Sequence, residues 1–311
     1  MPSEQTPDHG EITVNPTFTI VDVFADAPFR GNQLAVFRHG THLSTDAMQA
    51  LARETHFSET TFLMSDAPDG RGGWPMRIFT PDREIPFAGH PTLGTAWVIQ
   101  QELIGEPVDT ITLALKAGHI PVTFTYSDGV PDLLDMTQLP PTFGARPDPA
   151  LVTAAVSLSP DDLDDRFPIE EVSTGLPTLI IPLRNRASLE RAHIHTEHYH
   201  RLEETIAARS LLLFAADPID PANDLHVRVF VPDYGVPEDP ATGSSNGCLA
   251  GWLSHHRYWG DSRIRATVEQ GFQIHRPSRL LLNAEPNGDG IVVRVGGRVF
   301  ASARGELAAL P

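Results

Sequence analysis

The chain has 311 residues, with 40 acidic and 23 basic side chains and a formal net charge of −17. This length favours two domains of ordinary size, and a hydrophobic content of 41% fits a folded globular chain. The acidity argues against a nucleic-acid surface and against docking on anionic membrane, because both need clustered Lys and Arg.

No stretch approaches eighteen uninterrupted apolar residues, and residues 1–15 are polar and carry no signal-peptide pattern. We therefore expect a flexible leader, no membrane segment and a cytoplasmic location. The single cysteine, Cys248, excludes an intrachain disulfide and every zinc site built on cysteine pairs.

Strand patterns cover residues 18–24 and 34–37, separated by a turn rich in Pro, Gly and Asn. Thr45 and Asp46 are then expected to cap an amphipathic helix. Glu59 stands just before a strand over residues 60–63, and a further strand covers 77–79.

The segment 92–99 is almost wholly apolar and offers no polar face. As a helix it must be surrounded by protein on all sides, so it suits a helix threaded through a curled sheet.

Two ten-residue segments, Arg77–Pro86 and Arg228–Pro237, lie 151 residues apart and form an internal repeat. Five of the ten positions are identical, and two more exchange Ile for Val. Each copy runs into a Gly-containing turn and a small apolar helix, the second over residues 243–253. The repeat predicts two halves of the same fold that face each other across a cleft.

A proline-rich stretch between Asp128 and Pro149 marks the expected boundary between these halves. We place the first half at residues 16–130 and the second at 131–311. The final strands, at 291–295 and 299–301, can belong to either half.

Each copy of the repeat places a loop of small residues at the start of its central helix, at residues 88–91 and 239–247. Free backbone N–H groups and the positive end of the helix dipole form an anion site there, although simple capping is the alternative. Two such ends across a cleft would hold a small carboxylate. Neither loop has the Gly-Lys-Ser/Thr ending of a phosphate loop, so nucleotide cofactors are unsupported.

The candidates for acid–base chemistry are Glu59, His90, Asp239 and Asp22. Glu59 has hydroxyl neighbours and apolar flanks, which can raise its pKa toward neutrality; the alternative is an exposed charge at a strand's start. A positive helix end favours a neutral His90 ring, which can instead be a buried capping residue. Asp239 can be catalytic or a simple N-cap.

The matching stretch of the second half, residues 210–214, carries no carboxylate, as expected for a single site between the halves. The histidines at positions 193, 195, 198 and 200 have charged neighbours and helical spacing. This pattern favours a solvated surface helix, and we assign no metal.

Seven short motifs occur in order along the chain: Asp22-Val-Phe-(x)4-Phe-x-Gly-Asn-x-Leu-Ala-Val, Ser58-Glu-Thr-Thr-Phe, Arg77-Ile-Phe-Thr-Pro, Phe87-Ala-Gly-His-Pro, Glu238-Asp-Pro-Ala-Thr-Gly-Ser, Glu269-Gln-Gly and Val295-Gly-Gly-Arg-Val. Together, from about Phe18 to Leu307, they resemble the PhzF-type phenazine-biosynthesis isomerase family. The resemblance implies the diaminopimelate-epimerase-like α/β (α+β) fold: two similar halves, each a curled, mostly antiparallel sheet around a central helix. It also implies a homodimer.

Epimerases of this fold place one cysteine at the head of each central helix. Here those loops carry Gly89-His90 and Thr242-Gly243, and Cys248 lies inside the second helix. A two-cysteine racemase is therefore excluded.

The archetypal family member isomerises trans-2,3-dihydro-3-hydroxyanthranilate without a cofactor. The resemblance implies that Glu59 shuttles a proton between substrate carbons and that His90 and Asp239 contact the substrate. The residues assigned to substrate binding, in part through helix-end amides that would grip a carboxylate, are Gly89, Thr242, Gly243, Ser244 and Asn32.

We therefore expect a cofactor-independent isomerase that moves a proton between carbons of a small carboxylate substrate. Two alternatives stay open. One is an epimerase or hydrolytic lyase with Glu59 as its sole base, and the other is a non-catalytic protein that binds a small acid.

Overall fold

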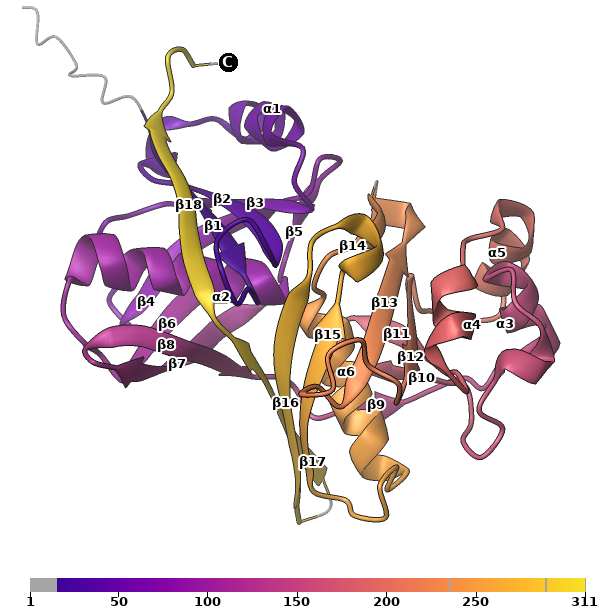
Figure 1. The fold of residues 1–311 in the computed structure, drawn as a ribbon. Helices are drawn as coiled ribbons and strands as arrows, with labels where there is room; N and C mark the ends of the chain where they lie inside the picture. The colour runs from indigo at the N-terminus through magenta and orange to yellow at the C-terminus, as the bar shows by residue number, and fades with distance from the viewer. Residues whose placement is uncertain (1–15, 235, 289, 311) are drawn as a thin grey trace, which may run out of the picture.

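The computed structural model describes residues 16–234, 236–288 and 290–310. Its strands join into one hydrogen-bonded system that is folded into two halves (Figure 1). The strands of the first half are β1 (Thr17–Val23), β2 (Asn32–Phe37), β3 (Glu59–Leu63), β4 (Gly73–Phe79), β5 (Glu84–Ile85), β6 (Thr110–Leu115), β7 (Gly118–Ser127), β8 (Val130–Thr137) and, from the end of the chain, β18 (Val299–Glu306). Those of the second half are β9 (Thr142–Phe143), β10 (Glu170–Ser173), β11 (Pro177–Pro182), β12 (Ser210–Ala215), β13 (Leu225–Val231), β14 (Val236–Asp239), β15 (Ile264–Gln270), β16 (Ser278–Asn287) and β17 (Gly290–Gly297).

The helices of the first half are α1 (Thr45–Thr55) and α2 (Gly89–Ile99), and those of the second are α3 (Pro149–Ala155), α4 (Arg186–Arg191), α5 (Thr196–Glu203) and α6 (Gly243–His255). Short helical turns are η1 (Gly40–His42), η2 (Gln100–Ile104), η3 (Pro160–Asp162), η4 (Pro232–Tyr234) and η5 (Phe272–Ile274). None of the helices among the described residues is long and apolar enough to cross a membrane.

Strand pairing follows the same plan in both halves. In the first, β2 pairs in parallel with β3, β3 antiparallel with β4, and β4 in parallel with β6, which follows α2. In the second, β11, β12, β13 and β15 repeat these three pairings, and β15 follows α6. The internal repeat of the sequence is therefore also a repeat of the fold.

The repeated arginines make equivalent contacts in the two halves. Arg77 pairs with Glu84 at 2.8 Å, and its guanidinium lies 5.0 Å from the centre of the Phe79 ring. Arg228 pairs with Glu238 at 2.7 Å and lies 4.7 Å from the Phe230 ring. Each ion pair fixes the short strand that leads to the head of a central helix.

In chain order the strands form two series, β1–β9 and β10–β18, and the last strand of each series pairs with a strand of the other. β9 follows the first half but pairs with β10, and β18 follows the second half but pairs with β1, as the long yellow strand of Figure 1 shows. β8 and β17 pair with each other and so join the two sheets. The division at residue 130/131 remains a prediction; β8 begins at this point.

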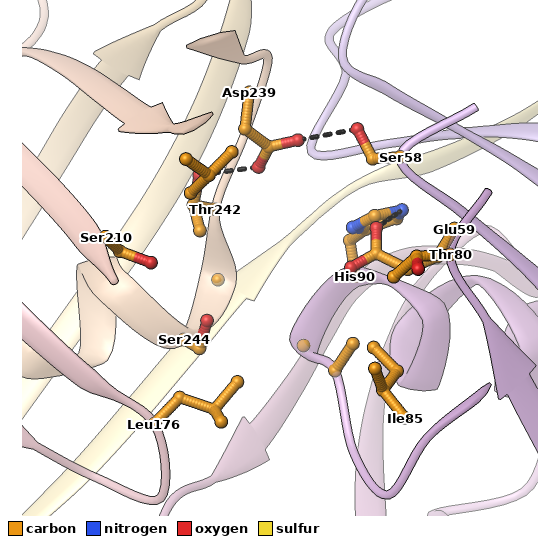
Figure 2. Close-up of a pocket in the computed structure, with 14 residues that line it drawn as sticks. Ser58, Glu59, Thr80, Ile85, His90, Leu176, Ser210, Asp239, Thr242 and Ser244 are labelled. Atoms are coloured by element: carbon orange, nitrogen blue, oxygen red, sulfur yellow. Dashed lines mark hydrogen bonds and ion pairs between the residues drawn. The ribbon is translucent and has the colours of Figure 1, made fainter. Parts of the chain in front are cut away.

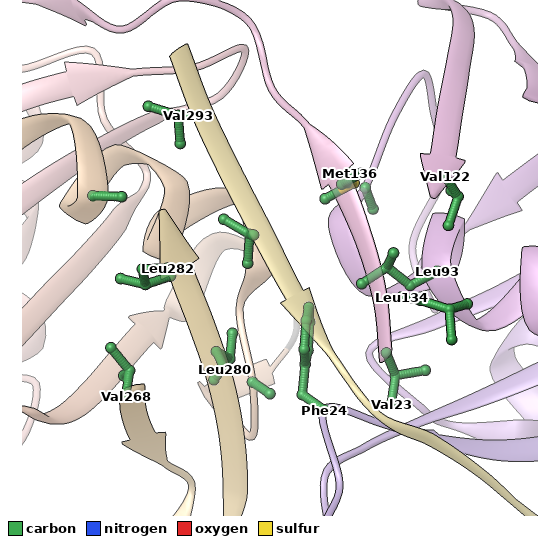
Figure 3. Packing of buried hydrophobic residues seen from close by; sticks show 14 of the residues in the cluster. Val23, Phe24, Leu93, Val122, Leu134, Met136, Val268, Leu280, Leu282 and Val293 are labelled. Atoms are coloured by element: carbon green, nitrogen blue, oxygen red, sulfur yellow. The ribbon is translucent and has the colours of Figure 1, made fainter. Parts of the chain in front are cut away.

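The central helices α2 and α6 lie inside the curled sheets, as the apolar sequence of residues 92–99 predicted. All eleven residues of α2 are buried. One hydrophobic cluster extends from the first half into the second, with Phe24 between strands of both halves (Figure 3). This shared core holds the heads of the two helices at a fixed position.

Local details differ from the sequence predictions in three places. The first strand ends at Val23, because Phe24 has a left-handed φ of 58°. Helix α1 is capped by Ser44, whose hydroxyl accepts from Ala47 N, and not by Thr45 and Asp46. Of the histidine run, His193 and His195 precede α5 and are not helical. In the parts of the chain that the structure covers, no three His, Cys, Asp or Glu come together as metal ligands.

Candidate active site

A cavity with about 590 Å³ of empty space, partly open to solvent, lies between the halves at the heads of α2 and α6. It is lined from the first half by Ser58, Glu59, Thr80, Ile85, Ala88, Gly89 and His90, and from the second by Leu176, Ser210, Val231, Asp239, Thr242, Gly243 and Ser244. Figure 2 shows these side chains converging from the two sides.

Glu59 is the first residue of β3, which begins one residue earlier than the sequence suggested, and only 18% of its side chain is exposed. Removal from water raises its pKa well above the ordinary glutamate value, and the negative charge of Asp239 raises it further. A carboxyl group with such a pKa is a stronger base than an ordinary glutamate and can also return a proton near neutral pH.

His90 lies in the first turn of α2 and is 3% exposed. Burial lowers its pKa to about 4, against the opposing effects of the Asp239 charge and the Gln33 backbone. The ring is therefore neutral at physiological pH. Its Nε2 lies 3.6 Å from Glu59 Oε2 and has no hydrogen-bond partner within the described residues, so this nitrogen is available to a ligand in the cavity.

Asp239, at the end of β14, is bound by residues of both halves. Its Oδ1 accepts hydrogen bonds from Ser58 Oγ at 2.8 Å and Asn32 Nδ2 at 2.9 Å, and its Oδ2 accepts one from Thr242 Oγ1 at 2.5 Å (Figure 2). These hydrogen bonds fix the position of the Asp239 carboxylate, whose charge acts on Glu59 and on His90.

Asn32, at the start of β2, is 1% exposed, and its amide nitrogen contacts groups of both halves. This nitrogen lies 2.9 Å from Asp239 Oδ1, 3.0 Å from the Ala241 carbonyl and 3.2 Å from His90 Nδ1. Because an amide nitrogen only donates, the contact with His90 is a hydrogen bond when Nδ1 is unprotonated, which places the ring proton on Nε2, the nitrogen facing Glu59.

The turn before Asn32 requires glycine. Gly31 has a φ of 73°, and a Cβ there would lie 2.3 Å from the Val23 carbonyl oxygen. The Phe-x-Gly-Asn motif thus combines the turn with the residue that the turn positions.

The heads of α2 and α6 meet in the cavity. A Cβ on Gly89 would lie 3.1 Å from Ser244 N and 3.2 Å from Gly243 Cα, so the two backbones approach closely. Neither N-cap residue, Ala88 or Thr242, caps its helix through a side chain, and neither first turn holds an acidic residue. The first N–H groups of both helices therefore offer a site for an anion.

Gln270 holds the loop between β14 and α6. Its amide donates to the Asp239 carbonyl at 2.8 Å and to Thr242 Oγ1 at 3.1 Å, and it accepts from Asn246 at 2.9 Å. This residue belongs to the Glu-Gln-Gly motif, which sequence reasoning noted without a role.

Known proteins resemble this chain in sequence and in structure. Residues 21–305 match the PhzC-PhzF family of phenazine biosynthesis-like proteins. The chain is 35% identical over 290 residues to the trans-2,3-dihydro-3-hydroxyanthranilate isomerase of Pseudomonas aeruginosa, covering 93% of this chain and 98% of that one.

The chain belongs to the PhzC-PhzF family. A PhzF-family phenazine biosynthesis protein from Bacillus anthracis has a similar structure, with a TM-score of 0.86 at 25% identity over 96% of this chain and all of the other. A probable proline racemase from Agrobacterium radiobacter shares the fold, with a TM-score of 0.64 at 14% identity over 95% and 94% of the two chains. The diaminopimelate-epimerase-like fold is confirmed, and this PhzF-family chain is an isomerase.

In this PhzF-family chain, Glu59, His90, Asp239, Gly89, Thr242, Gly243 and Ser244 all line one cavity. Asn32 does not line it but binds Asp239 beside it. Asp22 lies elsewhere, bound to Arg276 at 2.7 Å.

The cavity also includes residues to which the sequence analysis gave no role in the site, such as Thr80, Ile85, Leu176, Ser210 and Val231. Thr80 and Val231 hold the same position, directly after Phe79 and Phe230, in the two repeated segments, and this repeat was the signal that could have found them.

Proposed function

We propose that this chain is a cofactor-independent isomerase that moves a proton between two carbons of a small, conjugated carboxylate, with Glu59 carrying the proton. The observation that carries this proposal is the placement of Glu59, with its raised pKa, beside the free Nε2 of His90 and both helix heads in one cavity.

The carboxylate of the substrate would bind the open N–H groups at the heads of α2 and α6. Glu59 would take a proton from an activated C–H group of the bound molecule. A conjugated system spreads the resulting negative charge, and the helix-end N–H groups and the His90 Nε2–H stabilise it. Glu59 would then return the proton to another carbon.

Among the described residues that line the cavity, Glu59 suits this shuttle best. The other carboxylate, Asp239, has both oxygens occupied by Ser58, Asn32 and Thr242. With Glu59 as the one carrier, removal and return take place on the same face of the substrate.

The named substrate of the Pseudomonas aeruginosa relative, trans-2,3-dihydro-3-hydroxyanthranilate, is the first compound to test. Conversion is followed by NMR in D2O with the wild type, Glu59→Gln and the control Glu54→Gln, which changes an exposed glutamate of α1. We expect Glu59→Gln to lose about 10²–10⁴-fold in rate and the control to keep the wild-type rate.

Glu59→Gln with wild-type turnover would overturn the proposal. If this compound is not converted, a panel of conjugated carboxylates is screened for C–H exchange with solvent. Exchange with inversion at a single carbon would instead assign an epimerase. Binding without any exchange would assign a protein that only recognises a small acid.

The resemblance also leads us to propose a homodimer. Analytical ultracentrifugation at micromolar concentration tests it, and a sedimenting mass near 34.0 kDa would contradict it.

A further inference from the structure

The strand register identifies the residue of the second half that is equivalent to Glu59. Thr60 of β3 pairs with Phe79, and Leu211 of β12 pairs with Phe230. The preceding residues, Glu59 and Ser210, therefore hold the same position in the two halves, each as the first residue of its strand. Both line the cavity, from opposite halves.

The polarity of the two walls differs at further equivalent positions. Thr80 in the first half corresponds to Val231 in the second, and both line the cavity. By the register of β2 and β11, Asn32 corresponds to Leu176. At these two positions the second half carries apolar side chains where the first carries polar ones, whereas Asp239 of the second half corresponds to Ile85 of the first. The position of Glu59 is held in the second half by the hydroxyl of Ser210.

The Ser210 hydroxyl is directed toward the middle of the cavity in Figure 2 and has no hydrogen-bond partner in the described parts of the chain. Its charged neighbour Arg209 does not line the cavity. The Arg209 guanidinium lies 3.4 Å from Asp233 and 3.6 Å from Glu203. A substrate group that meets Ser210 therefore faces a neutral hydroxyl, and the neighbouring cavity residues Thr242 and Ser244 are also uncharged (Figure 2).

We propose that Ser210 is a specificity-determining residue that binds a neutral polar substituent of the substrate, such as a hydroxyl or amino group, on the edge facing the second half. This inference rests on the proposed function. It narrows the substrate class to small conjugated carboxylates that carry such a substituent. A site that presents a hydrogen-bonding group discriminates against analogues that leave the group unpaired.

The test uses four unreactive aromatic acids: benzoate, anthranilate, 3-hydroxybenzoate and 3-hydroxyanthranilate. Their affinities are measured by calorimetry for the wild type, Ser210→Ala and Ser244→Ala. Ser244 is the matched control because its hydroxyl lines the same cavity at the head of α6, where the carboxylate is expected. Thermal melting checks that both variants fold.

We expect the wild type to bind at least one substituted acid about threefold to tenfold more tightly than benzoate, the range of one neutral hydrogen bond. Ser210→Ala should remove this preference and leave the benzoate affinity within about twofold. Ser244→Ala should weaken all four acids by a similar factor and keep the preference.

A preference that persists in Ser210→Ala overturns the assignment of Ser210, and so does equal affinity of the wild type for all four acids. In both cases the wild type still binds carboxylates, so the proposed function stands. If the wild type binds none of the four at millimolar concentration, the carboxylate site itself is wrong and both proposals fall.

Discussion

Asn32 joins the two halves through one side-chain amide, and its replacement by leucine tests this connection. Leucine has the same number and branching of side-chain heavy atoms but cannot donate a hydrogen bond. The change removes a bond to the charged Asp239 Oδ1, a bond to the Ala241 carbonyl and the contact with His90 Nδ1. A bond to a charged group contributes about 1.5–3 kcal/mol and a neutral one about 1 kcal/mol, so the free energy of unfolding should fall by about 3 kcal/mol.

Ser58→Ala is the matched control, because Ser58 donates to the same Asp239 oxygen without contacting His90. We expect a loss of about 1 kcal/mol from this half-buried residue, measured for both variants by urea unfolding. Nitrogen-15 NMR of labelled histidine should show a changed His90 tautomer in Asn32→Leu and an unchanged one in Ser58→Ala. A loss below about 1 kcal/mol for Asn32→Leu, or equal losses in the two variants, would refute the reasoning.

Three further predictions concern the helix heads and the titrating groups. The pKa of Glu59 is raised in the folded chain, so the folded wild type loses stability as pH rises above about 4.5, where the unfolded chain releases this proton more readily. Glu59→Gln cannot release a proton there, so its melting temperature should equal that of the wild type at pH 4 and exceed it at pH 8. A Cβ on Gly247 would lie 1.8 Å from Gln138 Oε1, so Gly247→Ala should break the hydrogen bonds of Gln138 with Gly243 and Thr174. The free energy of unfolding, measured in urea, should fall by about 1–3 kcal/mol, and adding Gln138→Ala to this variant should lower it little further. Gly89→Ala pushes against the backbone of Ser244 and should lower kcat/KM about tenfold or more; wild-type activity would show that the close approach of the helix heads is not needed.

The core architecture was predictable from the sequence because two of its signals are local. The apolar segment at residues 92–99 has no polar face, so that as a helix it must be buried, and the repeated segments Arg77–Pro86 and Arg228–Pro237 mark equivalent strands. The sequence left open whether the final strand, β18, returns to the first half, and it did not predict that β9 pairs with β10, since both pairings depend on strands far away along the chain. The cap of α1 was misplaced by one residue because Ser44 and Thr45 are both good capping residues.

The sequence motifs predicted which titrating residues belong to the candidate site, but they did not predict how these residues are arranged. Glu59, His90 and Asp239 each stand in a motif, but the motifs do not show that Asp239 is bound by donors from both halves. Ser210 has no motif of its own: the sequence matched the stretch 210–214 to that of Glu59, and the strand register makes Ser210 itself the counterpart of Glu59.

The crossing of β18 links the last residues of the chain to the first strand. β18 pairs with β1 over its length, from Thr17 opposite Glu306 to Val23 opposite Val299. A deletion beginning at residue 298 would therefore strip one flank of β1 and leave its backbone groups open to water or to another chain. The loss would reach Val23, which pairs with Asn32 near the start of the chain, and residues 16–130 expressed alone would lack this strand.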